Sequence, residues 1–447
     1  MSSGPLSRRA FLGAAAVAPG ALAAAASPHP NDAVGSARPQ DAGRRLAGHS
    51  IAALRDLYRR DLFEDYLPFV DRRVVDHERG GFMCDVDPDG RRISTSKSSW
   101  FDGRGLWVHA FVYTHFGRDP RQLEIARKTA GFLLRTRPPG GDDLWPRTYT
   151  RDGQALLPAD GEIYGDLFVA EGLAEYAHAA GEAEPAEIAR ELILKCVRLY
   201  DRPDYRPVIG RTYLGPDARP FPGARILGVW MVLLRVCTQM LERHADPAIE
   251  AIARRSVDAI MDAHFNPDFE LFNELLNHDL SRPDNEYAQL VYTGHCVEVL
   301  WMVLDEARRR GDAALFDLAA ARYRRHIAVA WDDVFGGLFR NLQHVERNVW
   351  VVDKVLWAQE EVLIGTLRLV ESGVEWAAEE FSRMYRYVRS TYPLTGSGRP
   401  IWMYAGNRRM EHASFLKMPP RLENYHHPRH LLLNLLVLER LLAGQAR

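Results

Sequence analysis

From residue 50 to the C-terminus, apolar residues recur at the three- and four-residue spacing of amphipathic helices, whereas strand-like alternation is rare and short. Gly, Pro, Asp or Asn punctuates most of the joins between these segments. The pattern predicts an all-α chain of twelve helices. They are expected to begin near Ile51, Gly103, Arg121, Asp166, Pro185, Gly223, Asp246, Asn285, Asp312, Asp353, Val374 and Pro428.

The predicted helices alternate in character. Every second one is apolar on nearly all sides, as in residues 226–234, whereas the others carry one apolar stripe and a charged face, as in residues 249–263. A helix that is apolar all round is buried on every side. Six buried helices alternating with six amphipathic ones, at a repeat of about sixty residues, predict an inner ring wrapped by an outer ring, an (α/α)6 barrel or toroid.

Two stretches interrupt the helical pattern and resemble each other. Residues 79–90 and 335–342 each contain a Gly-Gly turn that opens a short hairpin, and a Pro-Asp-Gly turn at 88–90 supports the first. Such hairpins are predicted to line one rim of the ring. Packing of loop ends and contact with a substrate explain them equally well.

The N-terminus has the layout of a twin-arginine export signal. Ser7-Arg8-Arg9-Ala10-Phe11-Leu12 precedes an uncharged, alanine-rich run through Ala26 that is too short for a permanent membrane anchor. We interpret residues 1–26 as a signal peptide, 27–47 as a disordered spacer and 48–447 as a single catalytic domain. The mature protein is expected to be periplasmic or extracellular, without membrane association.

Charge and motif content narrow the possible ligands. The formal net charge is −2 and basic residues are interspersed with acidic ones, so nothing indicates a partner nucleic acid or anionic lipid. The four cysteines are scattered, and no paired-histidine metal motif, phosphate loop or serine nucleophile elbow is recognised. His264 and His278 are expected in solvent-exposed loops. A small neutral or weakly charged ligand is favoured, with no metal or other cofactor.

Two histidines are candidates for proton transfer. Glu298 lies three positions after His295, on the same predicted helix face, where a carboxylate can orient an imidazole and raise its basicity. His426 lies at a predicted helix start, where the helix dipole disfavours imidazolium. Each histidine alone is more simply a packing or capping residue. Brought together in one ring, they could move a proton on and off a carbon next to a carbonyl.

Entries to other inner helices carry further candidates. Trp100 is suited to stack on a sugar ring, and Arg104 to donate to a sugar or enolate oxygen, although a buried arginine that ties loops together is an equal alternative. Tyr164 and Asp166 open the fourth helix, where N-capping explains Asp166 as well as binding does.

The tenth predicted helix is unusually polar for a buried one. Lys354, Trp357 and Glu361 share one face by their spacing, with Gln359 nearby. Polar groups on a buried helix need partners or a cavity. Between the two, we favour a cavity.

These motifs, taken in order, resemble the N-acylglucosamine 2-epimerase superfamily, which includes cellobiose 2-epimerases and aldose–ketose isomerases. The resemblance runs from about residue 50 to the C-terminus. It rests on Gly80-Gly81-Phe82, Trp100 to Arg104, Ile163-Tyr164 with Asp166, Gly294-His295 with Glu298, Trp331-Asp332 with Gly336-Gly337, Lys354 to Glu361, and His426 with Arg429.

The resemblance implies an (α/α)6 barrel that acts on a free reducing sugar without a cofactor. We expect the protein to be a monomer or a homodimer. The resemblance also implies that His295 and His426 exchange the proton at C2 through a cis-enediolate, that Arg104 steadies the carbonyl or enolate oxygen, and that Glu298 supports His295. The residues then expected to bind the substrate are Trp100, Tyr164, Asp166, Glu274, Lys354, Trp357, Gln359, Glu361 and Arg429.

Departures from the family pattern and rival functions leave alternatives open. Asp102 replaces a common glutamine, and Gln359 stands where acylglucosamine-type members tend to have histidine, which favours the cellobiose-epimerase or isomerase side. A glycoside or unsaturated-uronide hydrolase on the same toroid would instead use a carboxylate pair such as Asp166 with Glu361 or Glu274. A catalytically silent sugar-binding protein is the third possibility.

Overall fold

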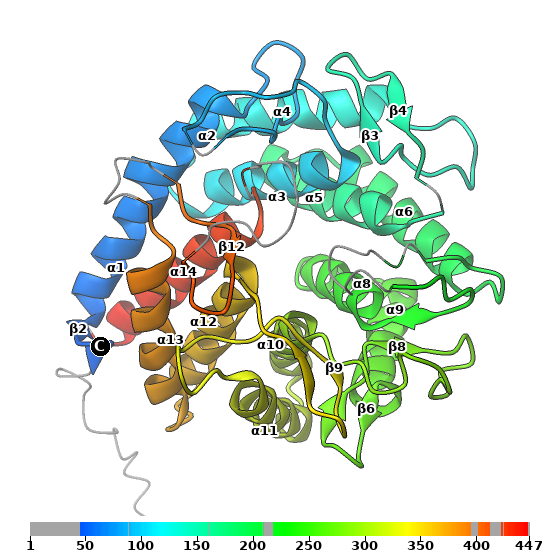
Figure 1. Cartoon of the computed structure of the whole chain (residues 1–447). Helices are drawn as coiled ribbons and strands as arrows, with labels where there is room; N and C mark the ends of the chain where they lie inside the picture. Colours follow the sequence, from blue (N-terminus) through cyan, green and yellow to red (C-terminus); the bar gives the residue numbers. More distant parts are fainter. Residues whose placement is uncertain are drawn as a thin grey trace, which may run out of the picture. The chain divides into compact units, whose positions relative to one another are not determined.

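Six helices are buried along most of their length because they are apolar nearly all round. They are α3 (Ser99–His115), α5 (Tyr164–Ala180), α8 (Leu227–Leu241), α10 (Thr293–Arg310), α12 (Leu356–Glu371) and α14 (His426–Gln445). Each contacts the next in this order, and α14 contacts α3 (Figure 1). The six therefore close into an inner ring.

The other helices expose one face and surround that ring. They are α1 (Ile51–Arg60), α4 (Pro120–Arg135), α6 (Glu184–Tyr200), α9 (Pro247–Asp258), α11 (Ala313–Ala330) and α13 (Ala377–Thr391). Each packs against an inner helix next to it in the chain, except that α1 packs against α14. The first outer helix continues through η1 (Asp61–Tyr66) into α2 (Leu67–Arg73), and α9 ends in η2 (Ala259–Ala263). The predicted (α/α)6 barrel is confirmed.

The computed structural model describes residues 45–445 except 88, 160, 208, 210–217, 395–400, 412–421 and 423. The expected signal peptide, 1–26, and residues 27–44 of the expected spacer lie outside the described residues. Residues 45–47, also expected in the spacer, instead belong to the fold, since Leu46 of β1 is completely buried. Residues 42–447 belong to one compact unit. Within the described part, no helix combines the length and apolarity needed to cross a membrane. All four cysteines are buried, and no disulfide joins them.

The two kinds of connection differ in length. Connections from an inner to the following outer helix are turns of at most five residues, whereas those from an outer to the following inner helix are long and carry the strands. The strands are β3 (Thr148–Tyr149), β4 (Ala155–Leu157), β5 (Arg225–Ile226), β6 (Phe265–Asn266), β7 (Leu271–Phe272), β8 (Leu275–Leu276), β9 (Asn341–His344), β10 (Val349–Val351), β11 (Lys354–Val355) and β12 (Ala405–Gly406), with β1 (Arg45–Leu46) and β2 (His49–Ser50) before α1. All pair antiparallel in two-stranded units. Because the helices alternate in direction, the strands in these long connections gather at the end where the inner helices begin, whereas β1 and β2 lead into the outer helix α1.

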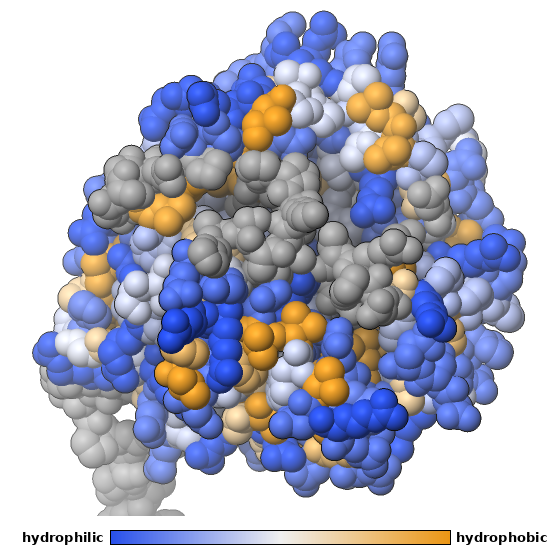
Figure 2. All heavy atoms as spheres, viewed as in Figure 1, coloured by the Kyte–Doolittle hydropathy of each residue, from blue (hydrophilic) through white to orange (hydrophobic). Residues whose placement is uncertain are grey.

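Exposed apolar side chains are also concentrated in the long connections. Charged and polar residues cover most of the face seen in Figure 2, with a few apolar clusters. The large apolar side chains exposed in the described part are Ile93, Leu156, Leu157, Leu318, Val334, Phe335 and Val349. All except Leu318 lie in connections that lead into inner helices.

Predicted helix starts lie within four residues of the observed ones, with one exception. The eighth helix was expected near Asn285 but begins at Thr293. Asn285 instead begins a turn, in which its side chain accepts from the backbone N–H of Tyr287. Asparagine favours such a turn and a helix N-terminus for the same reason, so the sequence signal is ambiguous there.

The two Gly-Gly stretches form equivalent turns. The φ angles are +82° and +83° at Gly80 and Gly81, and +77° and +78° at Gly336 and Gly337, which is the left-handed region that favours glycine. In each turn a completely buried lysine closes the loop.

Each of these lysines bridges a buried aspartate and the first glycine of its turn. Lys97 Nζ lies 3.0 Å from Asp76 and donates to the carbonyl of Gly80 over 2.6 Å. Lys354 Nζ lies 2.9 Å from Asp332 and donates to the carbonyl of Gly336. The repeated arrangement anchors the connections in front of α3 and α12, which carry Trp100 and Trp357 at the same distance after the lysine.

The closest inner-helix crossing, between α3 and α5, generates a stability prediction. A Cβ at Gly103 would lie 2.4 Å from the backbone carbonyl of Phe168, so the two helices approach backbone to backbone. Gly103→Ala should lower the free energy of unfolding by about 1–3 kcal/mol, because the helices must separate. Gly444→Ala is the matched control, since a Cβ there meets nothing within 4 Å. Equal denaturation midpoints for both variants would contradict this packing.

Candidate active site

The candidate residues lie in the first two turns of the inner helices, at the hairpin end of the ring. Trp100 and Arg104 are on α3, Tyr164 on α5, His295 on α10, Trp357 and Glu361 on α12, and His426 and Arg429 on α14. Residues far apart in the sequence therefore meet because every inner helix begins at the same end.

The two histidines contact the same tryptophan. The ring centroids of His295 and Trp357 are 5.9 Å apart, and those of Trp357 and His426 are 5.0 Å apart. Trp357 in turn packs on α10, because a Cβ at Gly294 would lie 2.3 Å from its indole. The structure thus brings His295 and His426 to one place.

Arg104 is held among three aromatic rings. Its guanidinium carbon lies 3.9 Å from the ring centroid of Phe168, 4.7 Å from that of Tyr425 and 5.0 Å from that of Trp100. Contacts of this kind hold a cation by attraction to the ring faces. Tyr425 also contacts His426, at a centroid distance of 5.4 Å, so Arg104 belongs to the same cluster as the histidines.

Tyr164 completes the cluster on the side of α8. A Cβ at Gly228 would lie 2.7 Å from the Tyr164 hydroxyl and 2.8 Å from Cε1 of His295. Tyr164 also packs against Trp100, with ring centroids 5.2 Å apart. Only glycine fits at 228, and its place inside an apolar run gave no sign of this in the sequence.

His295 has a carboxylate partner. Its Nδ1 lies 2.8 Å from Oε1 of Glu274, which is completely buried between β7 and β8. Burial favours the neutral imidazole, but the charge and hydrogen bond of Glu274 outweigh burial and raise the pKa of His295 above its usual value. The nearby Arg104 charge opposes this rise.

His426 has a carboxylate partner of its own. Its Nδ1 lies 2.8 Å from Oε1 of Glu361, and Trp301 donates its indole N–H to Oε2 of the same carboxylate over 2.7 Å. Arg429, which is 1% exposed, lies 2.6 Å from Glu361 and 2.5 Å from Glu298. His426 therefore shares its carboxylate with a buried guanidinium, whereas Glu274 forms no ion pair with an arginine or lysine among the described residues.

The expected partnership between His295 and Glu298 needs correction. Glu298 binds Arg429 instead and lies 3.9 Å from Nδ1 of His426. Glu274, expected to bind substrate, is the residue that hydrogen-bonds His295. The Glu274 backbone accepts a hydrogen bond from the N–H of Leu227 and donates one to the carbonyl of Leu290. These bonds hold the connection over the start of α10, where Glu274 reaches His295.

Three further residues expected to bind substrate are used inside the protein. Asp166 is completely buried and binds Lys195 at 2.6 Å and the backbone N–H of Trp145. Lys354 closes the second Gly-Gly turn, as described above. The Gln359 amide exchanges hydrogen bonds with the backbone of Leu338, over 2.7 Å and 3.1 Å. The polar groups of all three are therefore engaged by the protein itself, and their expected contact with a substrate stays a prediction.

Glu361 and Arg429 are also engaged inside the protein. Both were expected to contact substrate, yet they are 0% and 1% exposed and bind each other. Both contact Nδ1 of His426, and their expected contact with a substrate stays a prediction. Among the expected substrate-binding residues, Trp100, Tyr164 and Trp357 are the ones that line the cluster of Arg104 and the histidines.

The two histidines expected in exposed loops differ in the structure. His278 is exposed, but His264 is completely buried, with Nδ1 2.7 Å from the carbonyl oxygen of Asn273. Burial lowers the pKa of His264 to about 4. The polar residues around His264 in the sequence gave no sign of this burial.

Among the residues that the structure describes, two groups of buried side chains have ligand atoms close enough for a metal ion. They are Glu298, Glu361 and His426, and Glu360, His427 and His430. In the first group, Arg429 already contacts all three members, at 2.5 Å, 2.6 Å and 3.1 Å. A guanidinium thus takes the place that a cation would need.

The arrangement is suited to moving protons beside a developing negative charge. Two imidazoles, each bound through Nδ1 to a carboxylate, lie against one indole, and a guanidinium lies in the same cluster. Carboxylate-bound histidines act as general acids and bases, and a fixed cation stabilises an oxyanion. Residues of this kind catalyse proton abstraction next to a carbonyl.

Comparison with known proteins identifies a family. The sequence model of the family described as N-acylglucosamine 2-epimerase (GlcNAc 2-epimerase) matches residues 80–428. The N-acylglucosamine 2-epimerase of Bos taurus is 27% identical over 281 residues, which cover 59% of this chain and 62% of the bovine protein. The match therefore spans less than two thirds of that relative.

Solved structures share the fold at low sequence identity. A sugar epimerase from a ruminal bacterium has a TM-score of 0.72 and 17% identity, over 87% of this chain and 99% of its own. The cellobiose 2-epimerase of Bacillus thermoamylovorans B4167 has a TM-score of 0.71 and 16% identity, over 87% and 100%. Two family 76 glycoside hydrolases share the fold less closely, with TM-scores of 0.54. Because the family model covers most of the sequence, the chain belongs to the N-acylglucosamine 2-epimerase family.

Proposed function

We propose that this protein is a sugar 2-epimerase or aldose–ketose isomerase that acts on a free reducing sugar. The observation that carries the proposal is the convergence of His295 and His426 on Trp357, each with a buried carboxylate on Nδ1. Because Nδ1 is the nitrogen held by the carboxylate, exchange of a proton with the substrate falls to Nε2. Family membership supports the same reaction class.

The proposed reaction begins with the open-chain sugar. One imidazole takes the proton from C2, and the C2–H bonding electrons move through C1 onto the carbonyl oxygen, which gives a cis-enediolate. Arg104 stabilises the negative charge on that oxygen. Carbonyl-adjacent C–H groups are weak acids in water, so this stabilisation supplies much of the required acidity.

The second imidazole decides the product by where it delivers a proton. Delivery to the opposite face of C2 gives the epimer. Delivery to C1, with transfer of a proton from the 2-hydroxyl to O1, gives the ketose. Both outcomes move only protons, so we propose that neither a redox cofactor nor a metal is needed for the reaction.

The hydrolase alternative is weaker in this structure. Its acid and base would be Asp166 with Glu361 or Glu274. Each of these carboxylates is completely buried, and each is bound by a cation or an imidazole: Asp166 by Lys195, Glu361 by Arg429 and His426, and Glu274 by His295. The hydrolase hypothesis also assigns no role in the reaction to the two carboxylate-bound histidines.

Hydrogen exchange at C2 tests the proposal. The purified mature protein, incubated in heavy water with a panel of reducing monosaccharides and disaccharides, should introduce deuterium at C2, observed by NMR. His295→Gln and His426→Gln should each lower the exchange rate by about 10²–10⁴-fold, because each removes a general acid or base. The exposed His278→Gln is the control. Absence of exchange with every sugar of the panel, from folded protein, would overturn the proposal. Unchanged sugar affinity in both histidine variants, with no turnover by the unsubstituted protein, would indicate a sugar-binding protein instead.

The pairing of His295 with Glu274 generates a pH prediction. A general base works when neutral, so the rate falls as pH drops below the pKa of His295. Since Glu274 raises that pKa, Glu274→Gln should move the acid limb of the kcat/KM profile to lower pH and reduce the plateau about tenfold or more. Glu298→Gln should move the limb less, because Glu298 binds Arg429. An equal shift in both variants would contradict the assignment.

We further propose export by the twin-arginine route, supported by Ser7 to Leu12 and the run to Ala26. Residues 1–47 fused to a folded reporter should direct it out of the cytoplasm. Replacing Arg8 and Arg9 together with lysine should abolish that transfer, because the receptor reads the arginine pair. Unchanged export of the double variant would contradict the proposal.

A further inference from the structure

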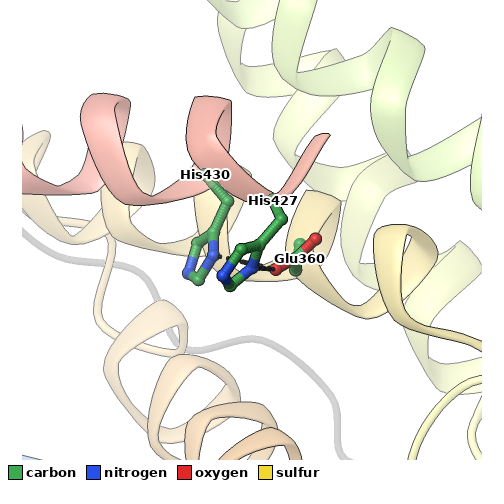
Figure 3. Close-up of side chains that lie close together, drawn as sticks. All are labelled: Glu360, His427 and His430. Carbon is green, nitrogen blue, oxygen red and sulfur yellow. Dashed lines mark hydrogen bonds and ion pairs between the residues drawn. The ribbon is translucent and has the colours of Figure 1, made fainter. Parts of the chain in front are cut away.

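A second group of histidines and a carboxylate lies beside the candidate active site and has no part in the proposed reaction. Glu360 on α12 and His427 and His430 on α14 are 0%, 6% and 2% exposed. His427 and His430 are three positions apart, so they share a helix face. Figure 3 shows the two rings side by side, each with a nitrogen directed toward Glu360. We call these three residues the His–Glu cluster.

The ligand atoms of the His–Glu cluster are close to the spacing that a metal ion requires. Oε1 of Glu360 lies 2.5 Å from Nδ1 of His427 and 3.2 Å from Nδ1 of His430, and all three atoms lie within 4.8 Å of one another. Zinc bonds of about 2.1 Å in tetrahedral geometry separate ligand atoms by about 3.4 Å. Small side-chain rotations therefore suffice to admit an ion.

The carboxylate retains capacity for a further ligand. Among the described residues, Oε2 of Glu360 has no hydrogen-bond partner although it is buried. A buried oxygen without a partner is costly, and its presence leaves the carboxylate able to rotate toward an ion. One carboxylate with two imidazoles is a ligand set that zinc and neighbouring divalent transition metals prefer.

Charge distinguishes this group from the active-site group with the same kinds of ligand. Arg429 lies among Glu298, Glu361 and His426, whereas no lysine or arginine in the described part forms an ion pair with Glu360. The ion-pair partners of Glu360 in the described part of the chain are the imidazoles of His427 and His430. The buried carboxylate therefore depends on the imidazoles, or on an ion that they bind, for compensation.

The surroundings fix His430 and enclose His427. Nε2 of His430 lies 2.9 Å from the Tyr58 hydroxyl, which accepts a hydrogen bond from Asn434 over 3.1 Å. Metal-bound histidines characteristically hold their other nitrogen in such a hydrogen bond. Rings of Tyr66 and Trp402 pack against His427, at centroid distances of 5.4 Å and 4.6 Å. These contacts give the site a fixed ligand on one side and an apolar wall on the other.

We propose that the His–Glu cluster binds one divalent transition-metal ion, such as Zn²⁺, through Glu360 Oε1 and the Nδ1 atoms of His427 and His430. Binding displaces the proton that Nδ1 of His427 holds in its hydrogen bond to Glu360. The ion joins the N-terminal turns of α12 and α14, one residue from Glu361 and His426 on each helix. The proposal is independent of the reaction assigned to those two residues.

Metal binding to the purified mature protein tests the proposal directly. Metal is first removed with a chelator, and the protein is then incubated with excess Zn²⁺ and passed through gel filtration at pH 7.5. It should retain close to one Zn²⁺ per molecule, measured by elemental analysis, and Zn²⁺ should raise its Tm. Glu360→Gln and His430→Gln should weaken binding by at least about 100-fold, because each removes a ligand. His426→Gln is the matched control, and its stoichiometry should be unchanged because that residue belongs to the group that contains Arg429.

Competition with protons provides a second readout. Binding should weaken at least about tenfold from pH 7.5 to 5.5, because protons compete with a metal ion for its nitrogen ligands. Other groups near the cluster do not account for such a change: Asp61 is paired with Arg389, and burial raises the pKa values of Tyr58 and Tyr392. A pH-independent affinity would contradict coordination by the two imidazoles.

A spectroscopic measurement keeps the test decisive if a variant fails to fold. Co²⁺ added to the unsubstituted chain should give the visible absorption of a four-coordinate nitrogen and oxygen site, and Zn²⁺ should displace it. No retained metal and no Co²⁺ spectrum from folded protein would overturn the proposal. Full binding by folded Glu360→Gln and His430→Gln would also overturn it.

Discussion

The candidate site depends on one buried cation, Arg429. Its guanidinium lies between Glu298 of α10 and Glu361 of α12, and so joins three neighbouring inner helices in a part of the barrel closed to solvent. Removing one partner from such a group leaves an uncompensated buried charge, which typically costs about 3–5 kcal/mol. Because Glu361 also holds His426, the position of that imidazole follows from the same ion pairs.

The barrel topology determines why chemistry gathers at one end. Short turns lead out of the inner helices, whereas long connections lead into them, and these connections bring Glu274 to His295 and the two lysine-closed turns to α3 and α12. The inner helices carry both histidines, and the connection before α10 carries Glu274, the carboxylate that binds His295. Polar residues on the inner helices also cross-link neighbours, as when Glu171 of α5 accepts from Tyr425 at the start of α14.

The order of the helices, the alternation of buried and amphipathic helices, and the positions of His295 and His426 near helix starts could be predicted from the sequence, because periodicity and helix-start signals are local. Partner choice could not. The three-residue spacing correctly placed His295 and Glu298 on one face, yet Arg429 from a distant helix took the carboxylate. The sequence also showed that polar residues lie on or next to buried helices, but not which groups bind them. Partners from distant segments do so: Lys195 binds Asp166, Asp332 binds Lys354, and the backbone of Leu338 binds Gln359. His427 and His430 were visible as neighbours, whereas Glu360 reaches them only through the packing of α12 on α14.

The central claim is that two imidazoles address opposite faces of one sugar carbon. A crystal structure with a bound open-chain polyol, which mimics the linear sugar without reacting, measures this most directly. The account predicts Nε2 of His295 and Nε2 of His426 on opposite sides of C2, each within about 3–3.5 Å of it or of C1, with Arg104 at the first oxygen. Both imidazoles on the same face, or one of them beyond reach of C1 and C2, would contradict it.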